Sequence, residues 1–114
     1  ICSLTKFKIP QYCMGACMHI KYKTLEENNY FAGIYASDIS GFKERLNTDR
    51  LKHLDKWVAR YGSKPSYIKD FGIWQKSSAG IVDGVSNIVD LDEAYTNYPT
   101  VINRLKLNKF EGRT

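Results

Sequence analysis

The sequence lacks any long apolar run: no stretch approaches the ~18 residues that a membrane-spanning helix needs. It has only three prolines, no low-complexity tract and no linker rich in proline or glycine, so we interpret its 114 residues as one folded unit. No signal peptide is recognisable, and the chain begins at Ile1, so we expect a processed product or part of a longer protein. Carboxylates are also missing from the beginning of the chain, because its first acidic residues are Glu26 and Glu27.

Cysteine and histidine are scarce as well. The three cysteines are Cys2, Cys13 and Cys17, and their odd number argues against a complete internal disulfide framework, so we expect reduced thiols. Cys13, Cys17 and the nearby His19 could begin a zinc site, but a structural site needs four ligands and the only other histidine is His53. We therefore predict no metal and no cofactor.

Basic residues outnumber acidic ones. The formal net charge of +5 favours an anionic partner, such as a nucleic acid, an acidic membrane surface or a cell wall. The basic residues are scattered rather than clustered, however, which is typical of an ordinary solvated surface. No glycine-rich or aromatic nucleic-acid signature accompanies them, so we expect no nucleic-acid partner.

Strand and helix patterns alternate along the chain. Short, nearly continuous apolar runs predict four strands, at residues 31–36, 56–60, 71–75 and 87–91. Gly80 and Gly84 predict a hairpin between the last two strands. This alternation is typical of an α/β fold with mainly parallel strands.

Helices are expected before, between and after these strands. Apolar positions at three- and four-residue spacing predict a helix over residues 17–29. Ser37 and Asp38 are expected to cap a short helix that continues through Leu46. Pro99, at a first-turn position, predicts the start of a final helix.

Three segments carry a specific resemblance. Residues 30–37 read Tyr-Phe-Ala-Gly-Ile-Tyr-Ala-Ser, residues 56–62 read Lys-Trp-Val-Ala-Arg-Tyr-Gly, and residues 73–92 begin with Ile-Trp-Gln and end with Val-Asp-Leu-Asp. In this order they resemble the C-terminal half of the glycoside hydrolase family 25 lysozymes, the bacterial and phage N-acetylmuramidases. The resemblance implies a partial (β/α) barrel of the TIM type over residues 20–114 and leaves residues 1–19 unassigned. A complete barrel typically needs ~250 residues.

Asp90 is the candidate catalytic residue. It lies near the end of the strand predicted at 87–91, and barrel enzymes place their reactive groups at the carboxyl ends of the strands. The resemblance aligns it with the aspartate of the family's Val-Asp-Leu-Asn motif and implies a supporting role at the active site. Asp92 shares its strand face at two-residue spacing, so we assign Asp92 to substrate binding. The alternative for Asp90 is a surface or capping carboxylate at a strand end.

Aromatic and amide side chains complete the candidate site. Sugar rings present flat C–H faces that pack on aromatic side chains, and Tyr35 and Trp57 lie on predicted strands at motif positions. Core packing between sheet and helices is an equal alternative for Trp57 and for Trp74. Gln75 is an amide on a strand expected to be buried, so it requires partners, either substrate hydroxyls or neighbouring backbone.

The resemblance implies a peptidoglycan-cleaving muramidase that acts outside the cell or on the cell wall. Glycoside hydrolysis needs one carboxyl group as proton donor and a second to stabilise or attack the anomeric centre. The family supplies the donor from an Asp-x-Glu pair before the Gly-Ile-Tyr strand, and no such pair precedes Tyr35 here. We therefore expect this chain alone to be inactive. The alternative is a non-catalytic module that binds cell-wall glycan or associates with itself, as a homodimer through open sheet edges.

Overall fold

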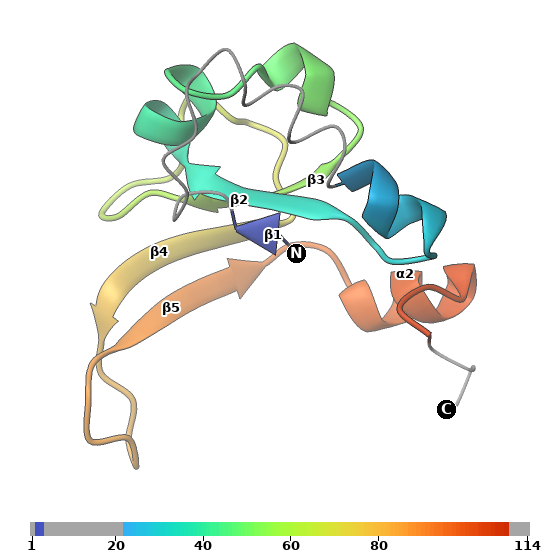
Figure 1. The fold of residues 1–114 in the computed structure, drawn as a ribbon. Coiled ribbons are helices and arrows are strands. Elements are labelled where there is room, and N and C mark those ends of the chain that lie inside the picture. The colour runs from blue at the N-terminus through green and yellow to red at the C-terminus, as the bar shows by residue number, and fades with distance from the viewer. Residues whose placement is uncertain (1, 4–21, 110–114) are drawn as a thin grey trace.

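The computed structural model describes residues 2–3 and 22–109. Its centre is a sheet in the order β1-β2-β3-β4-β5, in which the first four strands run parallel and β5 runs antiparallel to β4 (Figure 1). The strands are β1 (Cys2–Ser3), β2 (Gly33–Ser37), β3 (Asp55–Ala59), β4 (Ile73–Gly80) and β5 (Val89–Ala94). The expected α/β fold with mainly parallel strands is confirmed. Over the described residues the structure shows a partial sheet rather than a barrel.

Helical segments connect the strands. Residues 22–27 are helical, in agreement with the described part of the helix predicted at 17–29, and residues 17–21 lie outside the described residues. Between β2 and β3 come a π-helix, η1 (Asp38–Lys43), and a 3₁₀-helix, η2 (Thr48–Leu51). The single short helix predicted to run through Leu46 is therefore wrong in its extent.

The final helix, α2 (Tyr98–Leu105), begins where Pro99 predicted. The side chain of Asn97 accepts a hydrogen bond from the backbone N–H of Thr100 and so caps its first turn. The hydroxyl of Tyr98 donates to the carboxylate of Asp55, which ties α2 to the beginning of β3. The helix is therefore fixed to the sheet at the amino ends of the parallel strands.

The strand bounds predicted for the β4–β5 hairpin are wrong. β4 continues to Gly80, and β5 covers Val89–Ala94 instead of residues 87–91. The cause is cross-strand pairing, because Gly80 opposes Val89 and residues 87–88 stay in the connecting loop. This loop projects from the sheet as the hairpin tip (Figure 1) and leaves four large aliphatic side chains exposed, those of Ile81, Val82, Val85 and Ile88.

One face of the sheet holds the apolar core. Ile34, Ala36 and Val58 are buried there by the segments that follow β2 and β3, which contribute Phe42, Leu51, Leu54 and Ile68. Figure 1 shows η1 and η2 on this side of the sheet. A side chain at Gly41 would place its Cβ 2.7 Å from that of Ala36, so the close approach of η1 to β2 requires glycine.

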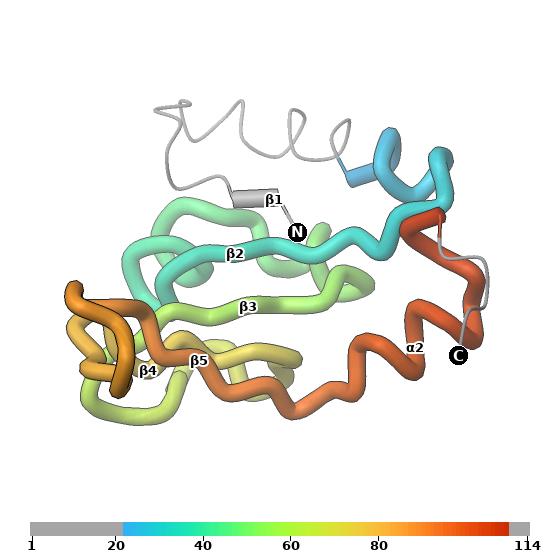
Figure 2. Tube along the Cα trace, turned by 90° about the horizontal axis from the view of Figure 1, so that it is seen from below, coloured from blue at the N-terminus to red at the C-terminus, as the bar shows by residue number. Residues whose placement is uncertain are grey.

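The opposite face carries the alternate residues of the same strands, because successive side chains of a strand point to opposite sides. The apolar run at residues 31–36 predicted a strand buried on both faces. In the structure, Tyr35 of β2 lies on this second face and is only partly buried. At the amino end of β2, Asn108 accepts from Phe31 N–H through its side chain and donates its own N–H to Asn29 C=O, both at 2.8 Å. Figure 2 shows this C-terminal segment (red) beside the start of β2.

Candidate functional site: a polar and aromatic sheet face

Strand register brings four candidate residues together on the second sheet face. Tyr35 of β2 lies directly opposite Trp57 of β3, and their rings meet edge to face with centroids 5.0 Å apart. Gln75 of β4 opposes Asp92 of β5 in the antiparallel pair. Four side chains that are separated by up to 57 positions in the sequence therefore form one surface across four strands.

Gln75 is at the centre of this surface. Only 4% of the residue is exposed, and its Oε1 accepts hydrogen bonds from the hydroxyls of Tyr35 and Tyr61, the latter at 3.3 Å. From the sequence, either substrate hydroxyls or neighbouring backbone were possible partners of Gln75. In the structure, the partners of its Oε1 are the two tyrosine hydroxyls. Tyr61 was missed as a site residue, although it belongs to the segment Trp-Val-Ala-Arg-Tyr-Gly that carried the resemblance.

The hydroxyl of Tyr35 is held in its neutral form. Burial raises its pKa to about 12, and Tyr61 together with the negative charges of Asp90 and Asp92 acts in the same direction. A phenol that stays protonated is a hydrogen-bond donor throughout the physiological range. Tyr35 therefore serves as a donor within the site.

Asp92 is anchored in the site. Its Oδ1 accepts a hydrogen bond of 2.7 Å from the indole Nε1 of Trp57, and the carboxylate remains exposed. Trp57 combines features of both alternatives, core packing and site residue. Its ring is partly buried and packs against Tyr35, whereas its indole N–H binds the exposed carboxylate of Asp92.

Asp90 lies at the other end of its strand from the position predicted. It is the second residue of β5, not a residue near the strand's carboxyl end. Because β5 runs antiparallel, its beginning nevertheless lies at the edge where the parallel strands β2, β3 and β4 end. The carboxylate is exposed, its charge contributes to the raised pKa of Tyr35, and no ion pair or side-chain hydrogen bond joins it to another described residue.

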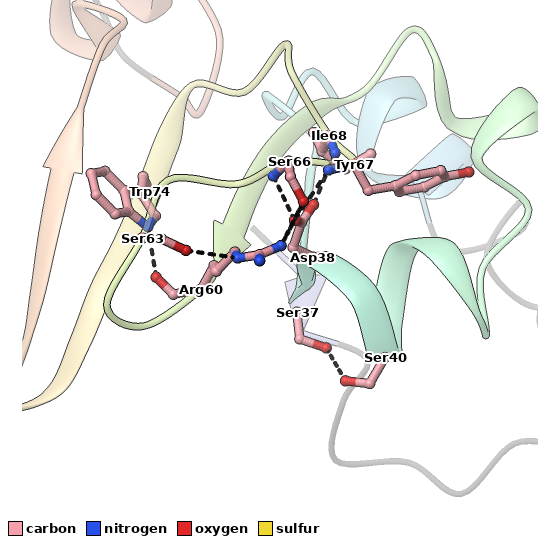
Figure 3. Close-up of polar contacts among 9 residues, drawn as sticks. All are labelled: Ser37, Asp38, Ser40, Arg60, Ser63, Ser66, Tyr67, Ile68 and Trp74. Atoms are coloured by element: carbon pink, nitrogen blue, oxygen red, sulfur yellow. Dashed lines mark hydrogen bonds and ion pairs between the residues drawn. The ribbon is translucent and has the colours of Figure 1, made fainter.

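A second carboxylate, Asp38, was predicted as part of a helix cap and has a different role. Ser37 occupies the N-cap position of η1 without a side-chain capping bond, and its hydroxyl instead meets that of Ser40. Asp38 is buried, with 1% of the residue exposed, and accepts hydrogen bonds from the backbone N–H groups of Ser66, Tyr67 and Ile68 (Figure 3).

The guanidinium of Arg60 completes the environment of Asp38 with an ion pair of 2.8 Å. Burial alone would raise the pKa of Asp38, but the backbone donors, led by Ile68 N–H, and Arg60 together lower it below its ordinary value. Arg60 also bonds the hydroxyls of Ser63 and Ser66 (Figure 3). Asp38 thus holds the loop that follows Tyr61 in place, and it is a structural carboxylate.

Trp74 belongs to the opposite face. It pairs with Val58, and its Nε1 donates to the backbone carbonyl of Arg60 at 2.8 Å. The packing alternative therefore applies to Trp74, which supports the β3–β4 connection and does not line the candidate site.

The acidic residues nearest the N-terminus lie away from this site. Glu26 belongs to the helix that precedes β2, at the amino ends of the strands, and its carboxylate is 3.8 Å from His53 Nε2. Within residues 2–3 and 22–109, no group of three or more metal-ligating side chains comes together, and no helix is long and apolar enough to cross a membrane. Among the described residues, Asp90 and Asp92 are the exposed carboxylates at the carboxyl edge of this face.

The fold and this face define a class: a mostly parallel α/β sheet that presents aromatic, amide and carboxylate side chains at its carboxyl edge. Over 53 residues the chain is 42% identical to an autolytic lysozyme of Clostridium acetobutylicum, a match that covers 46% of this chain and 16% of the relative. No model of a protein family matches the chain.

Two crystal structures share the fold. One is that of the CTP1L endolysin, with a TM-score of 0.59 and 24% identity over 80% of this chain and 32% of that one. The other is a bacterial lysozyme from Streptomyces coelicolor, with a TM-score of 0.62 and 20% identity over 83% of this chain and 46% of that one. The resemblance to lysozymes is confirmed. The chain spans less than half the length of each of these relatives.

Proposed function

We propose that residues 20–114 of this chain form the C-terminal part of a peptidoglycan-cleaving muramidase with a (β/α) barrel. Such an enzyme hydrolyses the β-1,4 bond between N-acetylmuramic acid and N-acetylglucosamine. The observation that carries the proposal is the gathering of Tyr35, Trp57, Gln75 and Asp92 on one sheet face, beside Asp90. The sequence match to an autolytic lysozyme and the fold shared with two lytic proteins support it.

The proposed roles follow from the geometry. Asp90 is an exposed carboxylate at the strand edge and assists the chemistry by stabilising positive charge at the anomeric centre. Asp92 is oriented by Trp57 and accepts hydrogen bonds from sugar hydroxyls. Tyr61 is 55% exposed beside the site and offers a flat face to a sugar ring. The substrate is peptidoglycan in the cell wall, outside the cell.

We propose that the chain does not cleave its substrate unaided. The lysozymes that it resembles take their proton donor from an Asp-x-Glu pair, and no such pair precedes Tyr35 here. General acid catalysis typically supplies ~10²–10⁴-fold of rate. Purified residues 1–114 should leave the turbidity of a Gram-positive cell-wall suspension unchanged. Clearing of the suspension that disappears in Asp90→Asn would show that the chain contains its own donor and would refute this part of the proposal.

The alternative is a non-catalytic module that binds cell-wall glycan or associates with itself. The specific observation in its favour is the exposed aliphatic side chains of the hairpin tip, residues 81–88. Co-sedimentation with insoluble peptidoglycan separates the readings in the full-length parent. Binding accompanied by hydrolysis supports the muramidase, whereas binding without hydrolysis supports the module.

A further inference from the structure

In the side-chain amide of Gln75, the oxygen accepts hydrogen bonds, whereas the nitrogen has no hydrogen-bond partner among the described residues. Its Oε1 accepts from both Tyr35 and Tyr61. An amide also carries an NH₂ group with two donor positions. Within the part of the chain that the structure describes, Nε2 of Gln75 donates to no acceptor, although only 4% of the residue is exposed.

The oxygen of Gln75 fixes the orientation of its side-chain amide, because the hydroxyls of Tyr35 and Tyr61 both donate to it. The NH₂ group lies on the other side of the amide carbon from this oxygen. Among the described residues it is therefore the part of the amide that the protein does not engage.

The other polar groups of this face leave Gln75 as its free donor. The indole N–H of Trp57 is engaged by Asp92, and the hydroxyl hydrogens of Tyr35 and Tyr61 are engaged by Gln75 itself. The carboxylates of Asp90 and Asp92 only accept hydrogen bonds when ionised. A ligand group that is purely an acceptor thus finds one unengaged donor among the described side chains here.

We propose that Gln75 recognises the acetamido group of the glycan by donating a hydrogen bond from Nε2 to its carbonyl oxygen. This inference rests on the proposed function, which supplies a substrate with N-acetyl groups. Sugar hydroxyls both donate and accept, so they can pair with Asp90 or Asp92, whereas an acetamido carbonyl only accepts. Gln75 is then a specificity-determining residue that distinguishes N-acetylated sugars from plain ones.

The experiment compares two neutral trisaccharides, N,N′,N″-triacetylchitotriose (abbreviated chitotriose) and cellotriose, which differ by acetamido groups in place of hydroxyls. Titration of residues 1–114 by calorimetry should show chitotriose binding roughly tenfold more tightly, the ratio that one hydrogen bond supplies. Gln75→Glu keeps the acceptor for both tyrosines and loses the NH₂ group, so it should bring the ratio close to one. Lys76→Gln is the matched control, because Lys76 is the next residue of β4 and pairs with Glu93. It should keep the tenfold ratio.

The outcomes separate the two proposals. If both sugars bind equally to the wild type, or if Gln75→Glu keeps the preference, the role of Gln75 is refuted while glycan binding stands. If neither sugar binds, the glycan-binding face is refuted and the role of Gln75 falls with it. Should Gln75→Glu fail to fold, nuclear magnetic resonance of the wild type decides. The side-chain NH₂ signals of Gln75 must shift with chitotriose and stay in place with cellotriose.

Discussion

The indole of Trp57 donates a hydrogen bond of 2.7 Å to the carboxylate of Asp92 and so joins β3 to β5 across the intervening strand β4. This bond fixes one of the two carboxylates on the sheet face. Asp90, two residues earlier on the same strand, has no such bond to a described side chain. The two aspartates therefore differ in kind: Asp92 is positioned by the protein, and Asp90 is available to a ligand.

The first prediction compares these two aspartates. Asp92→Asn should lower the free energy of unfolding by about 1 kcal/mol, because it weakens a charge-assisted hydrogen bond. Asp90→Asn should change it by no more than about 0.5 kcal/mol, as expected away from packing. In a full-length parent, Asp90→Asn should abolish lysis. Urea denaturation measures both stabilities, and a larger loss for Asp90→Asn would mark that residue as structural.

The second prediction concerns Asp38. Replacing it with alanine leaves three backbone N–H groups and Arg60 without their acceptor, which should cost about 3 kcal/mol of unfolding free energy. Asp49→Ala is the matched control, since its carboxylate is 89% exposed, and it should cost far less. Equal effects of the two substitutions in urea denaturation would contradict the structural role of Asp38.

The pKa of Asp38 also predicts a pH dependence. Its folded-state pKa lies below its ordinary value of 3.8, so its contribution to stability is complete above that pH. The contribution is lost as the pH falls through the lowered pKa. The unfolding free energy of the wild type should therefore decline more steeply below about pH 4 than that of Asp38→Asn. Parallel declines in the two proteins would count against the assigned pKa shift.

The third prediction concerns Tyr35 at high pH. Its pKa is raised to about 12 from 10.0, so its contribution to stability is complete below pH 10.0 and is lost as the pH rises through about 12. Tyr35→Phe should remove one step of tyrosinate formation near pH 12 in an ultraviolet titration. The later step of Tyr98, whose pKa is raised still further by burial and by Asp55, should remain. Tyr67→Phe, whose ring is 42% exposed, should leave the step of Tyr35 in place. Loss of the same step in both variants would refute the assignment.

The fourth prediction is self-association. Burial of the aliphatic hairpin tip and pairing of an open sheet edge both favour a homodimer. A two-fold pairing of β5 with its copy would bring the acidic side chains of Asp90, Asp92 and Glu93 close to one another. The dimer should therefore strengthen as added salt screens the repulsion between these charges.

Sedimentation velocity of residues 1–114 at several salt concentrations tests this. Ile88→Lys should weaken association, because Ile88 is 67% exposed at the hairpin tip. Lys64→Gln, an exposed position in the loop after β3, is the control and should change nothing. A 13.1 kDa monomer at every salt concentration and at high protein concentration would refute the prediction.

Local patterns predicted most of the fold. The apolar runs around Ile34 and Val58 marked parallel strands, because a strand buried by its neighbours cannot tolerate polar residues on its core face. Pro99 marked the start of α2, because its fixed backbone angle suits a first helical turn. The period-two alternation of a strand also predicted that Asp90 and Asp92 share one face.

The sequence by itself thus determined most of the strands, the apolar face and the side chains of the candidate site other than Tyr61. Only the tertiary structure decided which of these side chains meet. Gln75 finds Tyr35 and Tyr61 through strand register, and Asp38 finds the N–H groups of a loop 28–30 residues further along the chain. Hydrophobic periodicity is a local property of the chain, whereas register and loop contacts depend on how distant segments pack, so no local pattern could specify them.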